Sequence, residues 1–298
     1  MTKSKQPTIA ITGASGFLGT DLLNFFVNKG WNVVALVRDQ NKLKTNKNIE
    51  YRAYDITKPV SNSTLKDVDY LVHAAYVKLD KQHPDAMEIN ISGAKNLLKA
   101  AKTAALSKIV FISTMSAHED AISVYGRQKL EIERLFLESK NATVLRCGLI
   151  VGNGGIVREM AGFMKSKHAV PLVGGGNQPL QIISVYDLVE IISNVLERSL
   201  TGRFVAANPK VYSYRSFYQA LAAELRVNVL FVPLPYGVLE GIFKFAELFH
   251  IPLGVGDDNL KGLKMLKSMP SKKDMKLIGV NPINLEKALA KSSIRVSK

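Results

Sequence analysis

Thr12-Gly13-Ala14-Ser15-Gly16-Phe17-Leu18-Gly19 is the stretch that decides the fold. It follows an apolar run at residues 9–11, which predicts a buried parallel strand, and it precedes apolar side chains at helical spacing: Leu22, Leu23, Phe26 and Val27. A glycine triplet between a strand and a helix is typical of a dinucleotide-binding turn. Gly13 would permit the tight turn, Gly16 the approach of backbone N–H groups to a pyrophosphate, and Gly19 close packing of helix on strand. The alternative is a loop that merely needs glycines.

Length and composition indicate a globular protein. The 298 residues, 47% of them apolar, are enough for one large domain or two smaller ones. No apolar stretch precedes the first strand, so we expect no signal peptide. The single cysteine, Cys147, excludes an internal disulfide framework and fits a reducing compartment, so we expect a cytoplasmic protein. Net charge is +15, and residues 261–298 hold ten Lys/Arg against two acids.

The second predicted strand, residues 32–37, bears on cofactor choice. It ends at Val37, where dinucleotide-binding folds often carry an acid for the adenosine ribose. Arg38 follows, and an arginine suits a 2′-phosphate through charge-assisted hydrogen bonds. We therefore expect NADP. NAD is the alternative, because Asp39 could still reach a ribose, and a solvated surface arginine is the structural alternative.

Three more strands are predicted at residues 49–54, 69–75 and 109–113, with a helix at 85–103 between the last two. The strand at 69–75 ends in His73-Ala74-Ala75. A histidine at a strand end suggests catalysis or metal binding, but no second His, Cys or acid stands at ligand spacing. A structural histidine is therefore the favoured interpretation, and we predict no metal site.

Tyr125 and Lys129 are the candidate catalytic pair. Four residues apart at the start of a predicted helix, they would share one helical face. An ammonium near a phenol favours the phenolate, so we expect Lys129 to lower the pKa of Tyr125 toward working pH. Such a tyrosine can move a proton at a hydroxyl or carbonyl while a cofactor carries the hydride. Thr114, at a strand end eleven residues earlier, could orient the same oxygen.

These motifs, in this order, resemble the extended short-chain dehydrogenases/reductases, the NAD(P)-dependent epimerase/dehydratase group. The resemblance continues through residues 145–152, similar to the family's sixth strand, and through residues 183–187. It implies an α/β fold: a Rossmann-type doubly wound parallel sheet at residues 1–150, and a smaller mixed substrate domain at 151–298 with some segments returning to the first. It also implies a homodimer through the helices at 85–103 and 125–137.

The resemblance implies roles for individual residues. Asp55 would contact the adenine, residues 73–75 would line the cofactor, Asn90 would support the active-site helix, and Lys129 would also hold the nicotinamide ribose. The expected cofactor-binding set is Gly13, Ser15, Gly16, Phe17, Leu18, Gly19, Arg38, Asp55, Ile56, His73, Ala74, Ala75, Asn90, Tyr125, Lys129 and Cys147. The expected catalytic set is Thr114, Tyr125 and Lys129.

The chain departs from the family pattern at informative places. Threonine replaces the usual serine at 114, and Cys147 stands where proline is commoner. Met115-Ser116 replaces the Asp-Glu pair of 4,6-dehydratases, which argues against dehydration. We therefore expect an NADP-dependent reductase of a keto group, with a nucleotide-linked 4-keto sugar as the favoured substrate. The alternatives are a sugar-nucleotide 4-epimerase, a reductase of a non-sugar ketone such as a sterol, and a non-catalytic sensor or assembly factor.

The second half is less informative. Residues 236–250 predict a largely apolar helix, for which a buried core helix is favoured over a lipid-facing or partner-facing one. Leucines alternate with Lys261, Lys264 and Lys267 in the segment that follows. These lysines are either solvated or attract a sugar-nucleotide diphosphate or an anionic membrane. Nucleic acid is disfavoured, because no aromatic-interleaved basic platform is visible.

Overall fold

A seven-stranded parallel sheet forms the centre of the protein in the computed structural model, which describes residues 6–39, 46–79, 82–238 and 257–295. The strand order is β11-β6-β5-β4-β1-β2-β3. Because the order reverses at β1, a crevice opens at the carboxyl ends of β1 and β4. The strands are β1 (Thr8–Thr12), β2 (Asn32–Val37), β3 (Ile49–Ala53), β4 (Tyr70–His73), β5 (Lys108–Thr114), β6 (Ala142–Cys147) and β11 (Gly202–Ala206).

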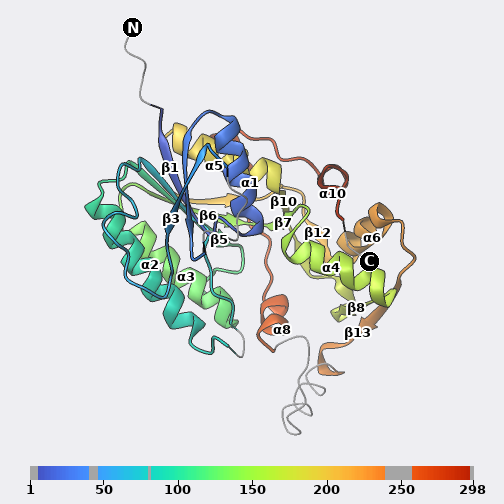
Figure 1. The fold of residues 1–298 in the computed structure, drawn as a ribbon. Helices are drawn as coiled ribbons and strands as arrows, with labels where there is room; N and C mark the ends of the chain where they lie inside the picture. Colours follow the sequence, from blue (N-terminus) through green and yellow to red (C-terminus); the bar gives the residue numbers. More distant parts are fainter. Residues whose placement is uncertain (1–5, 40–45, 80–81, 239–256, 296–298) are drawn as a thin grey trace.

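Helices cover both faces of this sheet (Figure 1). On one face lie α1 (Phe17–Asn28), α5 (Val185–Glu197) and α9 (Lys272–Ile278); on the other lie α2 (Ala86–Thr103) and α3 (Val124–Leu137). Each face has its own apolar core, with Phe26 buried in the first and Phe136 in the second. Strands such as β2 are apolar almost throughout, because helices on both sides bury both faces of a parallel sheet. The predicted doubly wound α/β fold is confirmed.

A smaller layer with a third apolar core lies beside the sheet (Figure 1). It contains three two-stranded pairs: β7 (Leu149–Val151) with β10 (Ile182–Ser184), β8 (Ala169–Val173) with β13 (Leu230–Leu234), and β9 (Pro179–Leu180) with β12 (Tyr212–Ser213). Around them are α4 (Gly155–Lys167), the 3-10 turn at Gly174–Gly176, α6 (Tyr214–Leu225), α8 (Asp257–Lys264) and α10 (Leu285–Ser292).

Residues 145–152 differ from the single strand suggested by the resemblance. The chain leaves the large sheet after Cys147 and joins β10 through β7. Gly148 makes this change of partner: its N–H donates to the Ala206 carbonyl at 3.1 Å, and a Cβ there would lie 2.6 Å from the Gln181 carbonyl oxygen. The two layers therefore meet at Cys147–Gly148, directly beside the carboxyl ends of β5 and β6.

Most of the apolar helix predicted at residues 236–250 lies outside the described residues. Within the described ranges, no helix is both long enough and apolar enough to cross a membrane. Some lysines of the basic segment interact within the chain: Lys267 forms an ion pair with Asp120, and the Lys291 ammonium lies 4.4 Å from the centre of the Tyr186 ring. Contact between this segment and an anionic membrane remains a prediction.

Candidate active site

The glycine turn after β1 has the geometry that its sequence predicts. Gly13 has a φ of +68°, and a Cβ there would lie 2.8 Å from the backbone of Ala74, so the turn needs glycine for both conformation and close approach. A Cβ at Gly19 would lie 2.1 Å from the Gly13 carbonyl oxygen, because α1 packs tightly on the turn. No side chain caps the start of α1 at Gly16. Its first N–H groups are therefore available to an anion.

Thr12 ties this turn to the loop after β4. Its hydroxyl oxygen accepts hydrogen bonds from the N–H groups of Ala74 and Ala75, both at 3.1 Å, and lies 2.8 Å from His73 Nδ1. With two N–H donors on the oxygen, the hydroxyl proton points at Nδ1, which must be unprotonated. Burial, together with the charge of Lys129, lowers the pKa of His73 to about 3, so the imidazole is neutral.

His73 therefore belongs to the core and not to the cofactor-contact set. It is 1% exposed and stacks on Phe111 and Phe136, on the α2–α3 side of the sheet. The expectation that all of residues 73–75 line the cofactor is wrong at His73, whereas Ala74 and Ala75 do line a cavity.

That cavity has a volume of about 340 Å³ and is the candidate site for the adenosine end of the cofactor. Its walls include the glycine turn, the end of β2 and the loops after β3 and β4: Gly13, Ser15, Gly16, Val37, Arg38, Tyr54, Ile56, Ala74, Ala75, Tyr76, Val77 and Lys78. Arg38 is exposed at this wall and Val37 is buried, so the last residue of β2 offers no carboxylate and the next residue offers a cation. Asp39, which follows them, is not among the residues that line the cavity.

Asp55 is not among the residues that line the cavity. Its carboxylate accepts hydrogen bonds from the N–H and the hydroxyl of Thr57, at 3.0 and 2.8 Å. Burial would raise the pKa of Asp55, but the bonds from Thr57 and the charges of Lys58 and Arg38 outweigh it and hold that pKa below its usual value. The neighbours of Asp55 line the wall in its place. An adenine contact through the Asp55 side chain stays a prediction.

A second cavity, of about 470 Å³, shares the walls at Gly13, Gly16, Ala74 and Tyr76 and continues to the candidate catalytic residues. Its lining includes Phe17, Leu18, Gly19, Thr114, Tyr125, Lys129 and Cys147. We call the two cavities together the cleft. The structure brings Thr114, Tyr125 and Lys129 together at this cavity. Thr114 is the last residue of β5, and Tyr125 and Lys129 lie in the first two turns of α3.

The protonation of Tyr125 differs from the sequence expectation. The residue as a whole is 36% exposed, but its hydroxyl lies at the buried end of the ring. Burial raises the pKa of Tyr125 to about 12, although a hydrogen bond with the Thr114 side chain acts in the opposite direction. The expectation that the pKa of Tyr125 falls toward working pH is wrong in this structure, because burial outweighs the effects that lower it. The Lys129 ammonium donates to the Ile112 carbonyl at 2.9 Å.

Lys129 and Cys147 also titrate abnormally. Burial lowers the pKa of Lys129 to about 8, with opposing effects of Cys147 and Glu133. Its ammonium lies 4.8 Å from the centre of the Phe111 ring and 5.1 Å from that of Tyr76, within the range of a cation–π interaction. Burial raises the pKa of Cys147 to about 12, so it stays a thiol. At neutral pH the cleft thus holds a neutral phenol beside a buried ammonium.

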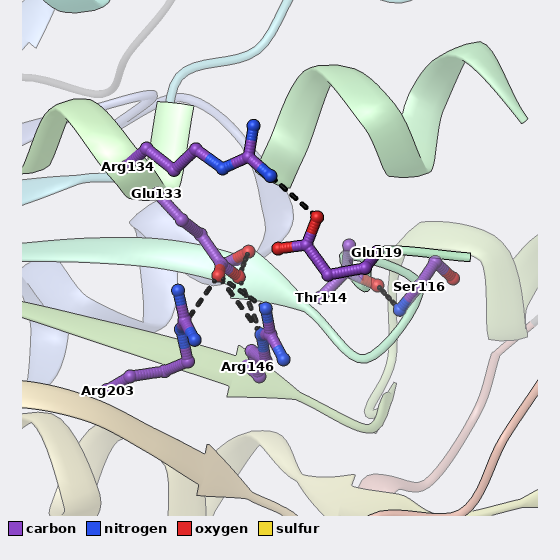
Figure 2. Close-up of polar contacts among 8 residues, drawn as sticks. Thr114, Ser116, Glu119, Glu133, Arg134, Arg146 and Arg203 are labelled. Carbon is purple, nitrogen blue, oxygen red and sulfur yellow. Dashed lines mark hydrogen bonds and ion pairs between the residues drawn. The ribbon is translucent and has the colours of Figure 1, made fainter. Parts of the chain in front are cut away.

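Glu133, one turn beyond Lys129 on α3, anchors this arrangement (Figure 2). Its carboxylate is fully buried and accepts hydrogen bonds from Ser113 Oγ at 2.5 Å and from Arg146 Nε and Nη2 at 2.9 and 2.8 Å. Arg203 Nε adds an ion pair at 3.0 Å. Ser113 lies next to Thr114 at the end of β5, and Arg146 lies next to Cys147 at the end of β6. The Glu133 network therefore holds α3 against the ends of these two strands. Sequence analysis missed Glu133, although its spacing of four from Lys129 places both on one helical face.

Two buried amides on α2 and α3 support the same region. Asn90 exchanges hydrogen bonds with the backbone of Val77, both at 2.8 Å, and donates to the Ala86 carbonyl at 2.7 Å. Gln128 donates to the same carbonyl from α3 at 2.8 Å. Asn90 thus holds a wall of the cleft without lining it, and Gln128, which sequence analysis missed, joins α3 to α2.

A segment distant in sequence closes the open side of the cleft. Asp258 on α8 accepts from the N–H groups of Val124 and Tyr125, at 2.5 and 3.3 Å, so a carboxylate faces the positive end of α3. Met265 contacts His118 through its carbonyl at 3.1 Å, and Lys267 pairs with Asp120. No local sequence signal indicates these contacts, because their partners are more than 130 residues apart.

The residues present fit an NAD(P) cofactor. The uncapped start of α1 offers N–H groups for a pyrophosphate, one cavity has room for the adenosine end, and the other leads to Tyr125 and Lys129. Within the described ranges, no three His, Cys, Asp or Glu residues gather in a metal-binding cluster.

Comparisons with known proteins agree with this geometry. A sequence profile of the NAD dependent epimerase/dehydratase family matches residues 9–207. An uncharacterized protein of Mycobacterium tuberculosis is 26% identical over 246 residues; the match covers 80% of this chain and 25% of the relative, so the chain spans about a quarter of that protein.

Solved structures share the fold. MoeE5 in complex with UDP-glucose and NAD superposes with a TM-score of 0.75 at 19% identity, covering 96% of this chain and 97% of the other. UDP-glucose 4-epimerase of Thermotoga maritima, with UDP-glucose, gives a TM-score of 0.74 at 19% identity and the same coverage. With the family profile extending from β1 through β11, this chain belongs to the NAD-dependent epimerase/dehydratase family of extended short-chain dehydrogenases/reductases.

Proposed function

We propose that this enzyme reduces a keto group, with NADPH as the hydride donor and Tyr125 as the proton donor. The observation that carries the proposal is geometric: Tyr125, hydrogen-bonded to Thr114, lies with Lys129 in a cleft that continues past the glycine turn into the cavity at the end of β2. A reduced nicotinamide, when bound, supplies the hydride. The Thr114 hydroxyl holds the substrate oxygen, Tyr125 protonates it, and the Lys129 ammonium stabilises the phenolate that forms.

Arg38 supports NADP over NAD. Its guanidinium is exposed at the wall of the adenosine-sized cavity, and the preceding residue offers no carboxylate to repel a 2′-phosphate. NAD remains the alternative, because the family and the structure of MoeE5 with NAD support it.

The substrate favoured by the comparisons is a nucleotide-linked keto sugar, because the structural neighbours are solved with UDP-glucose. Epimerisation at C4 is the second candidate, supported by the likeness to UDP-glucose 4-epimerase. An epimerase must first take a proton from a hydroxyl, which needs a phenolate. The raised pKa of Tyr125 agrees with the protonated form that a reductase uses.

The test is Tyr125→Phe. We expect turnover to fall by about 100-fold or more, since the only proton donor at the substrate oxygen is removed, while NADPH binding is retained. Tyr70→Phe is the matched control, because Tyr70 lies at the start of β4, stacked on Trp31, and lines neither cavity. Turnover of Tyr125→Phe close to that of the parent enzyme would refute the mechanism.

We also infer a homodimer through α2 and α3. The two helices pack side by side on one face of the sheet (Figure 1), where two copies can form a four-helix interface. Sedimentation should show twice the mass of the 32.8 kDa chain. A monomer at micromolar concentration would contradict this assembly.

A further inference from the structure

The part of the cleft beyond Tyr125 is where the substrate would lie, apart from its reacting carbonyl group. We call it the substrate lobe. Its walls come from the loop after β5, from β7, from α4, from β9 and from the segment after α8: Met115, Leu149, Ile150, Ile156, Leu180 and Leu266. All six are apolar, and an apolar wall favours an apolar ligand surface because both are removed from water together.

Four polar side chains also line the substrate lobe: the uncharged Ser116, Gln181 and Tyr214, and the cationic Lys267. Two of them, Gln181 and Lys267, have partners within the chain. The Gln181 amide donates to the Asn208 carbonyl at 3.1 Å and accepts from the Met269 N–H at 2.7 Å. The Lys267 ammonium is paired with Asp120. Among the described residues that line this cavity, Lys267 and Lys129 are the only cations, and Lys129 lies at the reacting end.

A diphosphate would be poorly held by such walls. Each of its phosphates carries negative charge and needs cationic or multiple N–H donors once it leaves water. Arg215, the guanidinium nearest in sequence to the Tyr214 wall, donates to the Gly175 carbonyl at 3.1 Å and does not line the cleft. In the described lining of this lobe, the cation within reach of a nucleotide diphosphate sugar is Lys267, which is already paired with Asp120.

We propose that the substrate is a ketone with an apolar, alicyclic or aliphatic body, whose carbonyl meets Thr114 and Tyr125 while the body packs in the substrate lobe. The proposal rests on the reductase function proposed above, and it replaces the nucleotide-linked keto sugar suggested by the structural neighbours with an apolar ketone as the substrate. In the balanced step, hydride from NADPH forms the C–H bond at the carbonyl carbon, the Tyr125 proton forms the O–H bond, and the products are a secondary alcohol and NADP⁺. Tyr214, on the far wall, is a neutral phenol that can contact an uncharged polar group of such a substrate.

The experiment follows NADPH oxidation by the full chain with two probes: 2-decalone, a bicyclic apolar ketone, and UDP-4-keto-6-deoxyglucose. UDP is added as a competitor. We expect Tyr125-dependent turnover of 2-decalone that UDP does not inhibit. Ile156→Gln should lower kcat/KM for 2-decalone by about fivefold, the effect of losing part of one apolar side-chain contact. Ile156 lines the lobe and is 54% exposed, so the substitution should not disturb folding.

Phe163→Gln is the matched control, because Phe163 lies on the same helix, is 46% exposed and does not line the cleft. The substrate proposal is overturned if 2-decalone is not reduced, if UDP competes with it, or if both α4 variants behave alike. Tyr125-dependent reduction of the keto sugar would overturn the substrate class alone. Failure of both probes to oxidise NADPH would count against the reductase function as well.

Discussion

At the adenosine end of the cleft, Arg38 presents its charge to solvent, whereas at the reacting end Lys129 and Glu133 carry theirs inside the protein. The difference sets what each charge can do. An exposed guanidinium acts on a ligand through contact and is screened by salt. A buried ammonium or carboxylate is screened little, shifts the titration of its neighbours, and is costly unless every charge has a partner. Under the proposed function, cofactor choice would depend on a surface residue, and proton transfer on a buried network.

The largest effect of a single substitution is expected at the buried end, where Glu133→Gln should lower the free energy of unfolding. The substitution leaves Arg146, whose side chain is 12% exposed, without its carboxylate. Breaking a buried pair from one side typically costs about 3–5 kcal/mol of the free energy of unfolding. Urea denaturation would measure the loss, and turnover of the folded fraction should fall as well, because α3 loses its anchor to the ends of β5 and β6.

Glu119→Gln is the matched control for Glu133→Gln. Arg134, the next residue on α3, pairs with Glu119 at 2.6 Å, but their side chains are 58% and 74% exposed (Figure 2). Such pairs contribute at most about 1 kcal/mol. If both variants lost the same free energy of unfolding, burial would not explain the expected difference between the two ion pairs.

This contrast also explains how far the sequence leads. The glycine turn and the Tyr125–Lys129 spacing follow from local pattern, because one strand, one turn and one helix suffice to place them. The neutral state of Tyr125 does not follow, because it depends on burial by residues from several elements. His73 separates two kinds of inference: the family resemblance implies a cofactor contact, whereas the missing metal-ligand partners favour a structural histidine. Its burial and its stacking on Phe111 and Phe136 agree with the structural interpretation.

Asp258 marks the other boundary of sequence reasoning. A carboxylate at the start of α3 is a favourable arrangement that helix chemistry anticipates. The acid at this position, Asp258, comes from a part of the chain more than 130 residues away. No local pattern in the sequence predicts that contact.

A smaller effect is expected at the exposed end, from Arg38→Ala. One charge-assisted hydrogen bond to a 2′-phosphate contributes roughly 1.5–3 kcal/mol, so the parent enzyme should prefer NADPH over NADH by about ten- to a hundredfold. The variant should lose most of that preference while NADH binding changes little. Titration of both cofactors against both proteins decides the matter. Equal affinities in the parent, or an unchanged ratio in the variant, would overturn the NADP assignment.

The smallest effect concerns pH and depends on the buried end alone. With a pKa of about 12, Tyr125 stays protonated throughout pH 6–9 and contributes no titration to the reduction. Lys129, whose pKa lies near 8, is charged below that pH and neutral above it. Since its ammonium stabilises the phenolate formed when Tyr125 gives up its proton, kcat/KM for reduction should be flat from pH 6 to 7, about half-maximal near pH 8 and lower beyond. Lys129→Arg keeps a charge at every pH in this range, so its activity, although reduced by the different shape of the guanidinium, should show no such fall. If kcat/KM of the parent enzyme rose with pH, the active form of Tyr125 would be the phenolate. That result would favour the epimerase over the reductase.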